Sequence, residues 1–175
     1  MAWSPDPLAN PEPLIRRVYA YVAYRIGDGP DAEDVTSATF ERALRYRESF
    51  DPWRGEPLGW LIGIARRCLV EAYAGAAIPV AEPPDVPGLD SPEEKAVRRL
   101  WLADALAHLD ERDRELIALR YGADLTARQI ADLLDLRTNA VEVALHRALA
   151  RLRVFLGERE SQVSEPRATD VQFEV

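Results

Sequence analysis

A proline-rich stretch near the middle of the chain limits the possible folds more than any other feature. From Ala76 to Pro92 the sequence reads "AAIPVAEPPDVPGLDSP", which contains five prolines and no helical period. Proline lacks a backbone N–H and interrupts regular structure, so this acidic stretch is typical of a linker. We therefore expect two small domains over residues 11–75 and 93–157, a linker over 76–92 and a disordered tail over 158–175.

Apolar residues recur with the period of an α-helix in both domains. In the first domain they are Leu58, Leu61, Ile62, Ala65, Leu69 and Ala72, and in the second Val141, Leu145, Ala148, Leu149, Leu152 and Leu156. Each set falls on one face of a helix. "SPEE", beginning at Ser91, is a helix start signal. Because no alternating strand pattern of useful length occurs, the sequence predicts an all-α fold.

The second domain contains the pattern of a helix-turn-helix. "TARQ" places Thr126 at an N-cap and Gln129 three residues later, which predicts a short helix from Ala127 to Leu134. A "DLRTN" turn follows, and a longer helix is expected to start near Ala140. This order is typical of a helix that enters the DNA major groove. The alternative is an ordinary amphipathic helical hairpin.

Composition excludes several classes of protein. The net charge of -8 argues against a protein that coats nucleic acid by itself, because such binding depends on phosphate neutralisation. The same charge is compatible with a protein that reads DNA as part of a complex with a larger partner. The single cysteine, Cys68, excludes an internal disulfide and argues against a cysteine-based zinc site.

Further classes of protein are excluded because the sequence lacks the motifs that mark them. No apolar run is long enough to cross a membrane, and the N-terminus lacks the pattern of a signal peptide. No phosphate loop, metal cluster or nucleophile–base pair is visible. We therefore expect a cytoplasmic protein that is not an enzyme, has no metal or cofactor and does not insert into membranes.

Six short motifs, taken in order, resemble one protein family. The first domain contains "DAEDV" with Phe40 following, then "FDP" and "WLIGIAR"; the matching residues are Asp31, Ala32, Glu33, Asp34, Val35, Phe40, Phe50, Asp51, Pro52, Trp60, Leu61, Ile64, Ala65 and Arg66. The second domain matches at Leu109, Arg114, Ile117, Leu119, Arg120, Tyr121, Gln129, Ile130, Ala131, Leu145, His146, Arg147 and Ala148. The chain thus resembles the extracytoplasmic-function (ECF) sigma factors of bacterial RNA polymerase. The resemblance covers most of the chain apart from the N-terminal arm, the linker and the tail.

The resemblance implies an alternative sigma factor that directs core polymerase to promoters. In the family, the helix that begins with the acidic motif docks on the clamp helices of the largest polymerase subunit. This implies a core-binding set made of Asp31, Glu33, Asp34 and Phe40. Carboxylates suit pairing with arginines of a partner helix, although Asp31 and Asp34 would also serve as a helix start signal. The second domain is expected to contact the flap of the second largest subunit, and an anti-sigma factor is a possible further partner.

The resemblance also implies a set of contacts to the minus-10 promoter element. This set comprises Phe50, Trp53, Arg54, Trp60, Arg66 and Arg67. Aromatic and guanidinium faces stack on unpaired bases, and arginines contact the DNA backbone. Phe50 and Trp60 have an alternative role as core aromatics. The family's consecutive basic residues after this helix are missing here, where the chain reads "YAGAA".

A third set is expected to contact the minus-35 element. It comprises Arg137, Thr138, Asn139, Glu142, His146, Arg147 and Arg151. The family usually has Thr-Val-Lys-Ser-Arg at the start of this helix, but here the sequence is "AVEVA" from Ala140 to Ala144. Glu142 would either read a cytosine or close a capping box with Asn139 as N-cap. Arg147 and Arg151 share a helix face, which either contacts phosphates or is only solvated.

This departure leaves a second function open. A sigma-like decoy would bind an anti-sigma factor or polymerase without reading promoters. The substituted helix would then have lost its DNA contacts while the protein-binding surfaces remained.

Overall fold

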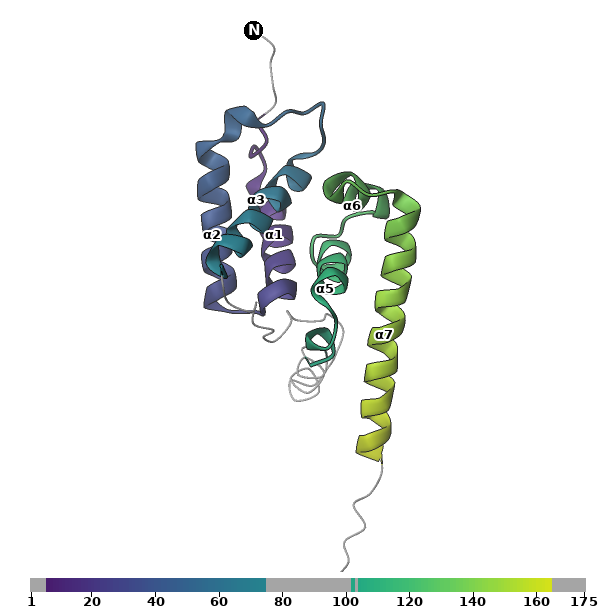
Figure 1. Cartoon of the computed structure of the whole chain (residues 1–175). Helices are drawn as coiled ribbons and strands as arrows, with labels where there is room; N and C mark the ends of the chain where they lie inside the picture. Colours follow the sequence, from purple (N-terminus) through teal and green to yellow (C-terminus); the bar gives the residue numbers. More distant parts are fainter. Residues whose placement is uncertain (1–5, 75–101, 103, 165–175) are drawn as a thin grey trace, which may run out of the picture.

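The computed structural model describes residues 6–74, 102 and 104–164, and side-chain burial up to residue 157 (Figure 1). The first domain comprises α1 (Pro11–Ile26), α2 (Pro30–Arg45), the short 3-10 helix η1 (Arg47–Ser49) and α3 (Pro57–Ala72). The second comprises α5 (Glu111–Ile117), the π-helical turn η2 (Ala118–Gly122), α6 (Ala127–Leu134) and α7 (Thr138–Ser164). No strand occurs among the described residues, which confirms the predicted all-α fold. The predicted linker and the start signal at Ser91 lie outside them.

Proline begins each of the longer helices of the first domain. Pro11, Pro30 and Pro57 occupy the first positions of α1, α2 and α3, where a missing N–H costs no hydrogen bond. The three helices pack on one another. The predicted apolar stripe of α3 is buried from Leu58 to Leu69, and Ala72 is exposed at the end of the helix.

The predicted helix-turn-helix is formed by α6 and α7. Thr126 and Gln129 form the predicted capping box at the start of α6. Asp135 ends that helix in the left-handed conformation, with φ 54° and ψ 48°, which Asp tolerates better than most residues. The next helix begins at Thr138 rather than near Ala140, and it continues to Ser164, into the segment predicted to be a disordered tail.

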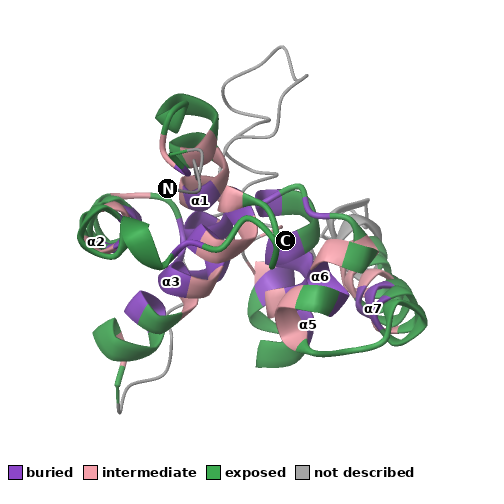
Figure 2. Ribbon diagram, turned by 90° about the horizontal axis from the view of Figure 1, so that it is seen from above, coloured by how far each residue is buried: buried purple, intermediate pink, exposed green. Residues whose placement is uncertain are grey.

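The two domains pack directly against each other, and one buried cluster extends through both (Figure 2). Val18 and Val22 of α1 belong to the same cluster as Leu116 and Leu119 of the second domain. Figure 1 places α5 between α1 and α7. The sequence predicted two domains but gave no sign that they share a core.

The two domains approach each other closely at Gly122, the last residue of η2. A Cβ added to Gly122 would lie 2.9 Å from Tyr21 Cα and 3.0 Å from the Ala20 carbonyl oxygen. These are backbone atoms of α1, which cannot move aside as a flexible side chain does. Glycine is therefore required for the observed contact between η2 and α1.

Candidate polymerase and promoter interfaces

The acidic residues predicted to bind polymerase lie exposed at the start of α2. Asp31, Glu33 and Asp34 all face solvent. The N-cap of α2 is Gly29, and no side chain caps it. Asp31 and Glu33 lie in the first turn, where the helix dipole favours negative charge.

Two further contacts shape this end of the first domain. The Tyr73 hydroxyl donates a hydrogen bond to Asp31 Oδ2 at 3.4 Å. Phe40, the fourth residue of the predicted core-binding set, is half-buried and packs against the core. The carboxylates are therefore the most accessible part of that set.

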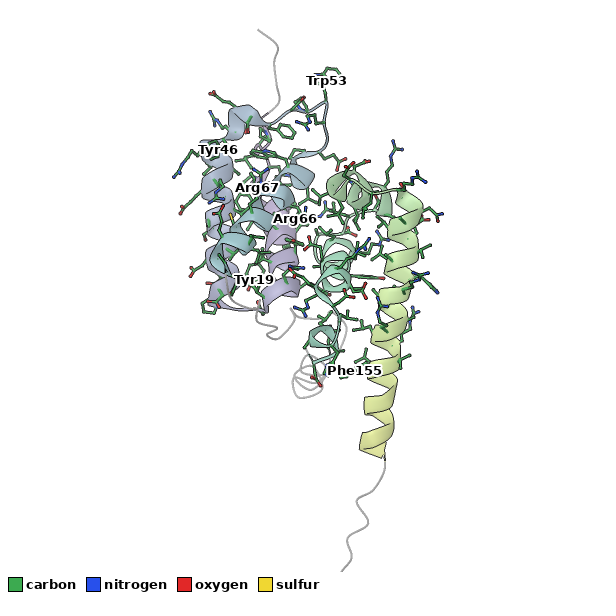
Figure 3. All side chains as sticks on the ribbon, in the orientation of Figure 1. Tyr19, Tyr46, Trp53, Arg66, Arg67 and Phe155 are labelled. Atoms are coloured by element: carbon green, nitrogen blue, oxygen red, sulfur yellow. The ribbon has the colours of Figure 1, made fainter. Side chains whose placement is uncertain are left out.

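The loop between α2 and α3 presents one fully exposed aromatic side chain. Trp53 is 95% exposed and points away from the helices (Figure 3). Asp51 organises the loop, because its Oδ1 accepts from the Trp53 N–H and its carbonyl oxygen accepts from the Arg54 N–H, both at 3.0 Å. Arg54 is exposed beside it. The geometry leaves the indole ring open to a partner on both faces.

The other two predicted stacking residues pack on each other. Phe50 is 8% exposed, and its ring centroid lies 5.6 Å from that of Trp60 at an angle of 58°. Tilted aromatic pairs of this kind contribute to packing. Phe50 is therefore buried and Trp60 is half-buried against the core, and neither ring pairs with Trp53 among the described residues.

The two predicted arginines of α3 differ in their surroundings. Arg67 is exposed. Arg66 lies between the domains (Figure 3), where its Nε is 3.0 Å from Glu115 Oε1 of α5. Arg66 is thus bound by a carboxylate of the second domain.

The Glu115 carboxylate contacts three donor side chains of the first domain. Its Oε1 accepts from the Tyr21 hydroxyl at 3.0 Å as well as from Arg66, and its Oε2 is 2.8 Å from Arg25 Nη1. The side chains of Arg25 and Glu115 are 5% and 15% exposed. Burial raises the pKa of Tyr21 well above its ordinary value, so the hydroxyl keeps its proton.

Further polar contacts cross the same boundary. Arg25 also reaches Glu111 Oε1 at 3.3 Å, and Arg17 Nε donates to the Ala123 carbonyl oxygen at 2.8 Å. Arg17, Tyr21 and Arg25 recur every four residues and therefore lie on one face of α1. The four-residue spacing of this set is visible in the sequence, but it does not reveal that the set faces the second domain.

The start of α7 forms an exposed face. Arg137, Thr138, Asn139, Glu142, His146 and Arg147 of the predicted minus-35 set are all exposed, and so is Val143. Because α7 begins at Thr138, Asn139 lies inside the helix, and the predicted capping box with Glu142 is wrong. Glu142 forms no hydrogen bond or ion pair with another described residue.

The surroundings of Arg151 differ from those of the other residues in the predicted minus-35 set. Its Nη2 pairs with Asp113 Oδ2 of α5, and the side chain of Asp113 is only 7% exposed. The pair ties α7 to α5 within the second domain. Arg147, one turn earlier, has no such partner among the described residues, so the two arginines have different surroundings.

No group of His, Cys, Asp and Glu within the described part of the chain is placed to hold a metal ion. The same part of the chain has no helix with the length and apolar character needed to span a membrane.

The sequence matches two family models in the expected order. The model for sigma-70 region 2 matches residues 12–77, and the model for sigma-70 region 4 matches residues 99–152. ECF RNA polymerase sigma factor BldN of Streptomyces coelicolor is 31% identical over 144 residues, 77% of this chain and 54% of BldN. ECF RNA polymerase sigma factor ShbA of Streptomyces griseus is 34% identical over 130 residues, 70% of this chain and 68% of ShbA. The chain spans about half the length of BldN.

Solved structures share the fold. CnrH, in complex with the cytosolic domain of CnrY, matches with a TM-score of 0.60 and 24% identity, over 84% of this chain and 82% of CnrH. The sigma factor RpoE of Bartonella quintana, in complex with the anti-sigma factor NepR, matches with a TM-score of 0.61 and 19% identity, over 82% of this chain and 92% of RpoE. The chain therefore belongs to the ECF sigma factors, the transcription factors that direct bacterial RNA polymerase to promoters.

Proposed function

We propose that this protein initiates transcription by opening the minus-10 element with its first domain and docking the minus-35 element with its second. The observation that carries the proposal is Trp53, 95% exposed on an ordered loop beside Arg54. Trp53 is the most exposed large apolar side chain among the described residues, ahead of Val70 at 68%. An unpaired base offers a flat face that stacks on such a ring.

Core polymerase is proposed to bind through the carboxylates of α2. Asp31, Glu33 and Asp34 are exposed, and arginines of the clamp helices in the largest subunit would pair with them. The second domain is proposed to contact the flap of the second largest subunit. In this proposal the protein has no catalytic site of its own and works in the cytoplasm with the polymerase.

The second domain is proposed to read duplex DNA with the exposed start of α7. The capping box and the left-handed turn after α6 fix the angle between the two helices. Arg137, His146 and Arg147 supply donors for phosphates, and Glu142 is free to accept from a base. An anti-sigma factor is a proposed regulator, because the relatives CnrH and RpoE are each bound to a second protein.

Run-off transcription tests the proposal. The purified protein with core polymerase should give specific transcripts from the genomic DNA of its own organism. Trp53→Ala should lower transcript yield roughly tenfold, because stacking on one base contributes about 1–3 kcal/mol. Binding to core polymerase should not change.

Ile15→Ala is the matched control, since it removes a 45% exposed apolar side chain from α1. Its transcript yield should equal that of the unmodified protein. If the protein binds core polymerase but never initiates, the decoy function replaces this proposal. Equal yields from Trp53→Ala and Ile15→Ala would remove the assigned role of Trp53.

A further inference from the structure

Two tyrosine hydroxyls contact the start of α2, where the carboxylates proposed to bind core polymerase lie. Tyr19 of α1 donates a hydrogen bond to Asp28 Oδ1 and accepts one from the Gly29 N–H at 3.4 Å. Tyr73, the C-cap residue of α3, donates to Asp31 Oδ2 at 3.4 Å. Figure 3 places Tyr19 at the end of the first domain where α1 ends and α2 begins. The start of α2 is therefore held by side chains from both neighbouring helices.

Both carboxylates stay available to a partner. Asp28 and Asp31 are exposed, and neither forms an ion pair with another described residue. The hydrogen bonds occupy Asp28 Oδ1 and Asp31 Oδ2, and the second oxygen of each accepts none from a described residue. A carboxylate has about four lone-pair sites, so one phenol bond leaves room for a two-pronged arginine contact. Each tyrosine thus orients a carboxylate without neutralising its charge.

The two phenols remain donors because they hold their own protons more tightly than an ordinary tyrosine does. The pKa of Tyr19 is raised, first by its hydrogen bond to Asp28 and then by burial, and the nearby charge of Glu33 adds to the shift. Burial raises the pKa of Tyr73, and the charge of Asp31 raises it further. Both hydroxyls therefore stay protonated at neutral pH. The effect of Glu33 also indicates that this third carboxylate lies near the Tyr19 phenol.

A carboxylate held in one orientation binds a charged partner more tightly than a freely rotating one. A side chain that already has its bound orientation loses less conformational freedom on binding. For a short side chain such as aspartate, this advantage amounts to about two- to fivefold in affinity. An arginine-bearing helix gains most, because its planar guanidinium group needs a carboxylate at a defined angle. An ion pair inside the domain would also fix the carboxylate, but it would compete with that arginine.

We propose that Tyr19 and Tyr73 are positioning residues that hold Asp28 and Asp31 in the orientation bound by arginines of core polymerase. Asp28, which precedes α2, thereby joins the carboxylates that contact the clamp helices. This role rests on the proposed binding of core polymerase through α2. Neither tyrosine itself contacts the polymerase.

The affinity of the full-length protein for core polymerase tests this role. Tyr19→Phe and Tyr73→Phe remove only the hydroxyls, and each should weaken binding about two- to fivefold. Tyr46→Phe is the matched control, because it removes the same group from a tyrosine that is 54% exposed at the end of α2. Its affinity should equal that of the unmodified protein. Thermal unfolding followed by circular dichroism should show that every variant is folded at the assay temperature.

Pairing each tyrosine variant with the loss of its carboxylate separates positioning from a purely structural role. Asp31→Ala should weaken binding, and Tyr73→Phe should cause no further loss in that background, because no charge remains to be oriented. The same result is expected for Tyr19→Phe in the Asp28→Ala background. A structural role alone would weaken binding by the same factor whether or not the carboxylate is present.

The contrary outcomes separate the positioning role from the proposed function. Unchanged affinity in both tyrosine variants, or losses that add fully to those of the alanine variants, would overturn the positioning role and leave the proposed function standing. Unchanged affinity in both Asp28→Ala and Asp31→Ala would instead remove the core-binding role of these carboxylates, and the positioning with it. Unchanged affinity in Asp28→Ala alone would remove Asp28 and Tyr19 from the role. Run-off transcription would still decide initiation separately.

Discussion

Glu142 and Val143 occupy positions where the family resemblance predicts polar residues that face the DNA groove. Both are exposed in the first turns of α7, and Glu142 has no partner among the described residues. A carboxylate there repels phosphates but accepts well from cytosine N4, while a valine side chain fits the methyl group of thymine. The pair therefore favours a base-reading role with few supporting phosphate contacts.

Glu142→Ala should relax the preference for a single base pair of the minus-35 element. A good base contact contributes about 1–3 kcal/mol of discrimination, so that position should become nearly random. Selection from a promoter library randomised over the minus-35 element measures this. If the selected sequences are unchanged, Glu142 makes no base contact.

Arg147→Ala should weaken promoter binding almost uniformly across sequences. Losing one phosphate contact lowers the slope of log affinity against log salt by about one. Affinity titrations at several salt concentrations give this slope. Arg151→Ala is the informative comparison, because Arg151 pairs with Asp113; it should lower thermal stability and leave the slope unchanged. An unchanged slope for Arg147→Ala would show that this helix face is exposed to solvent and contacts no phosphate.

At the scale of single elements, the helices followed their local signals closely. The capping box predicted α6, and the apolar stripe predicted α3. The start of α7 was misplaced because Asn139 is a good N-cap residue by type. The turn after α6 instead closes through Asp135 and a hydrogen bond from Leu136 N–H to the Ala131 carbonyl oxygen, so the helix begins sooner.

Thr126→Ala should destabilise the helix-turn-helix by about 1 kcal/mol, the usual cost of losing an N-cap hydroxyl. Thr126 Oγ1 accepts from the Gln129 N–H at 3.2 Å, and alanine cannot replace that bond. Urea unfolding followed by circular dichroism measures the change. Thr126→Ser keeps the hydroxyl and should unfold close to the starting protein; equal losses in both variants would rule out the cap as the cause.

At the scale of the whole molecule, the sequence predicted the two helical domains but not the contact between them. The spacing of Arg17, Tyr21 and Arg25 defines a face of α1, yet nothing near them in sequence identifies Glu115 as the partner. Periodicity describes one helix at a time, and the contact joins residues on opposite sides of the linker. The roles of Phe50 and Trp60 were open for the same reason, since an aromatic residue looks alike in a core and on a surface.

Gly122 belongs to neither the polymerase-facing nor the DNA-facing residues, yet it lies where η2 meets the backbone of α1. Any side chain at this position would push η2 away from α1 while leaving the exposed start of α7 unchanged. The packing of the two domains and the proposed contacts to bases therefore depend on different positions of the chain. A single added methyl group would thus alter how the domains pack without altering any residue proposed to contact a promoter.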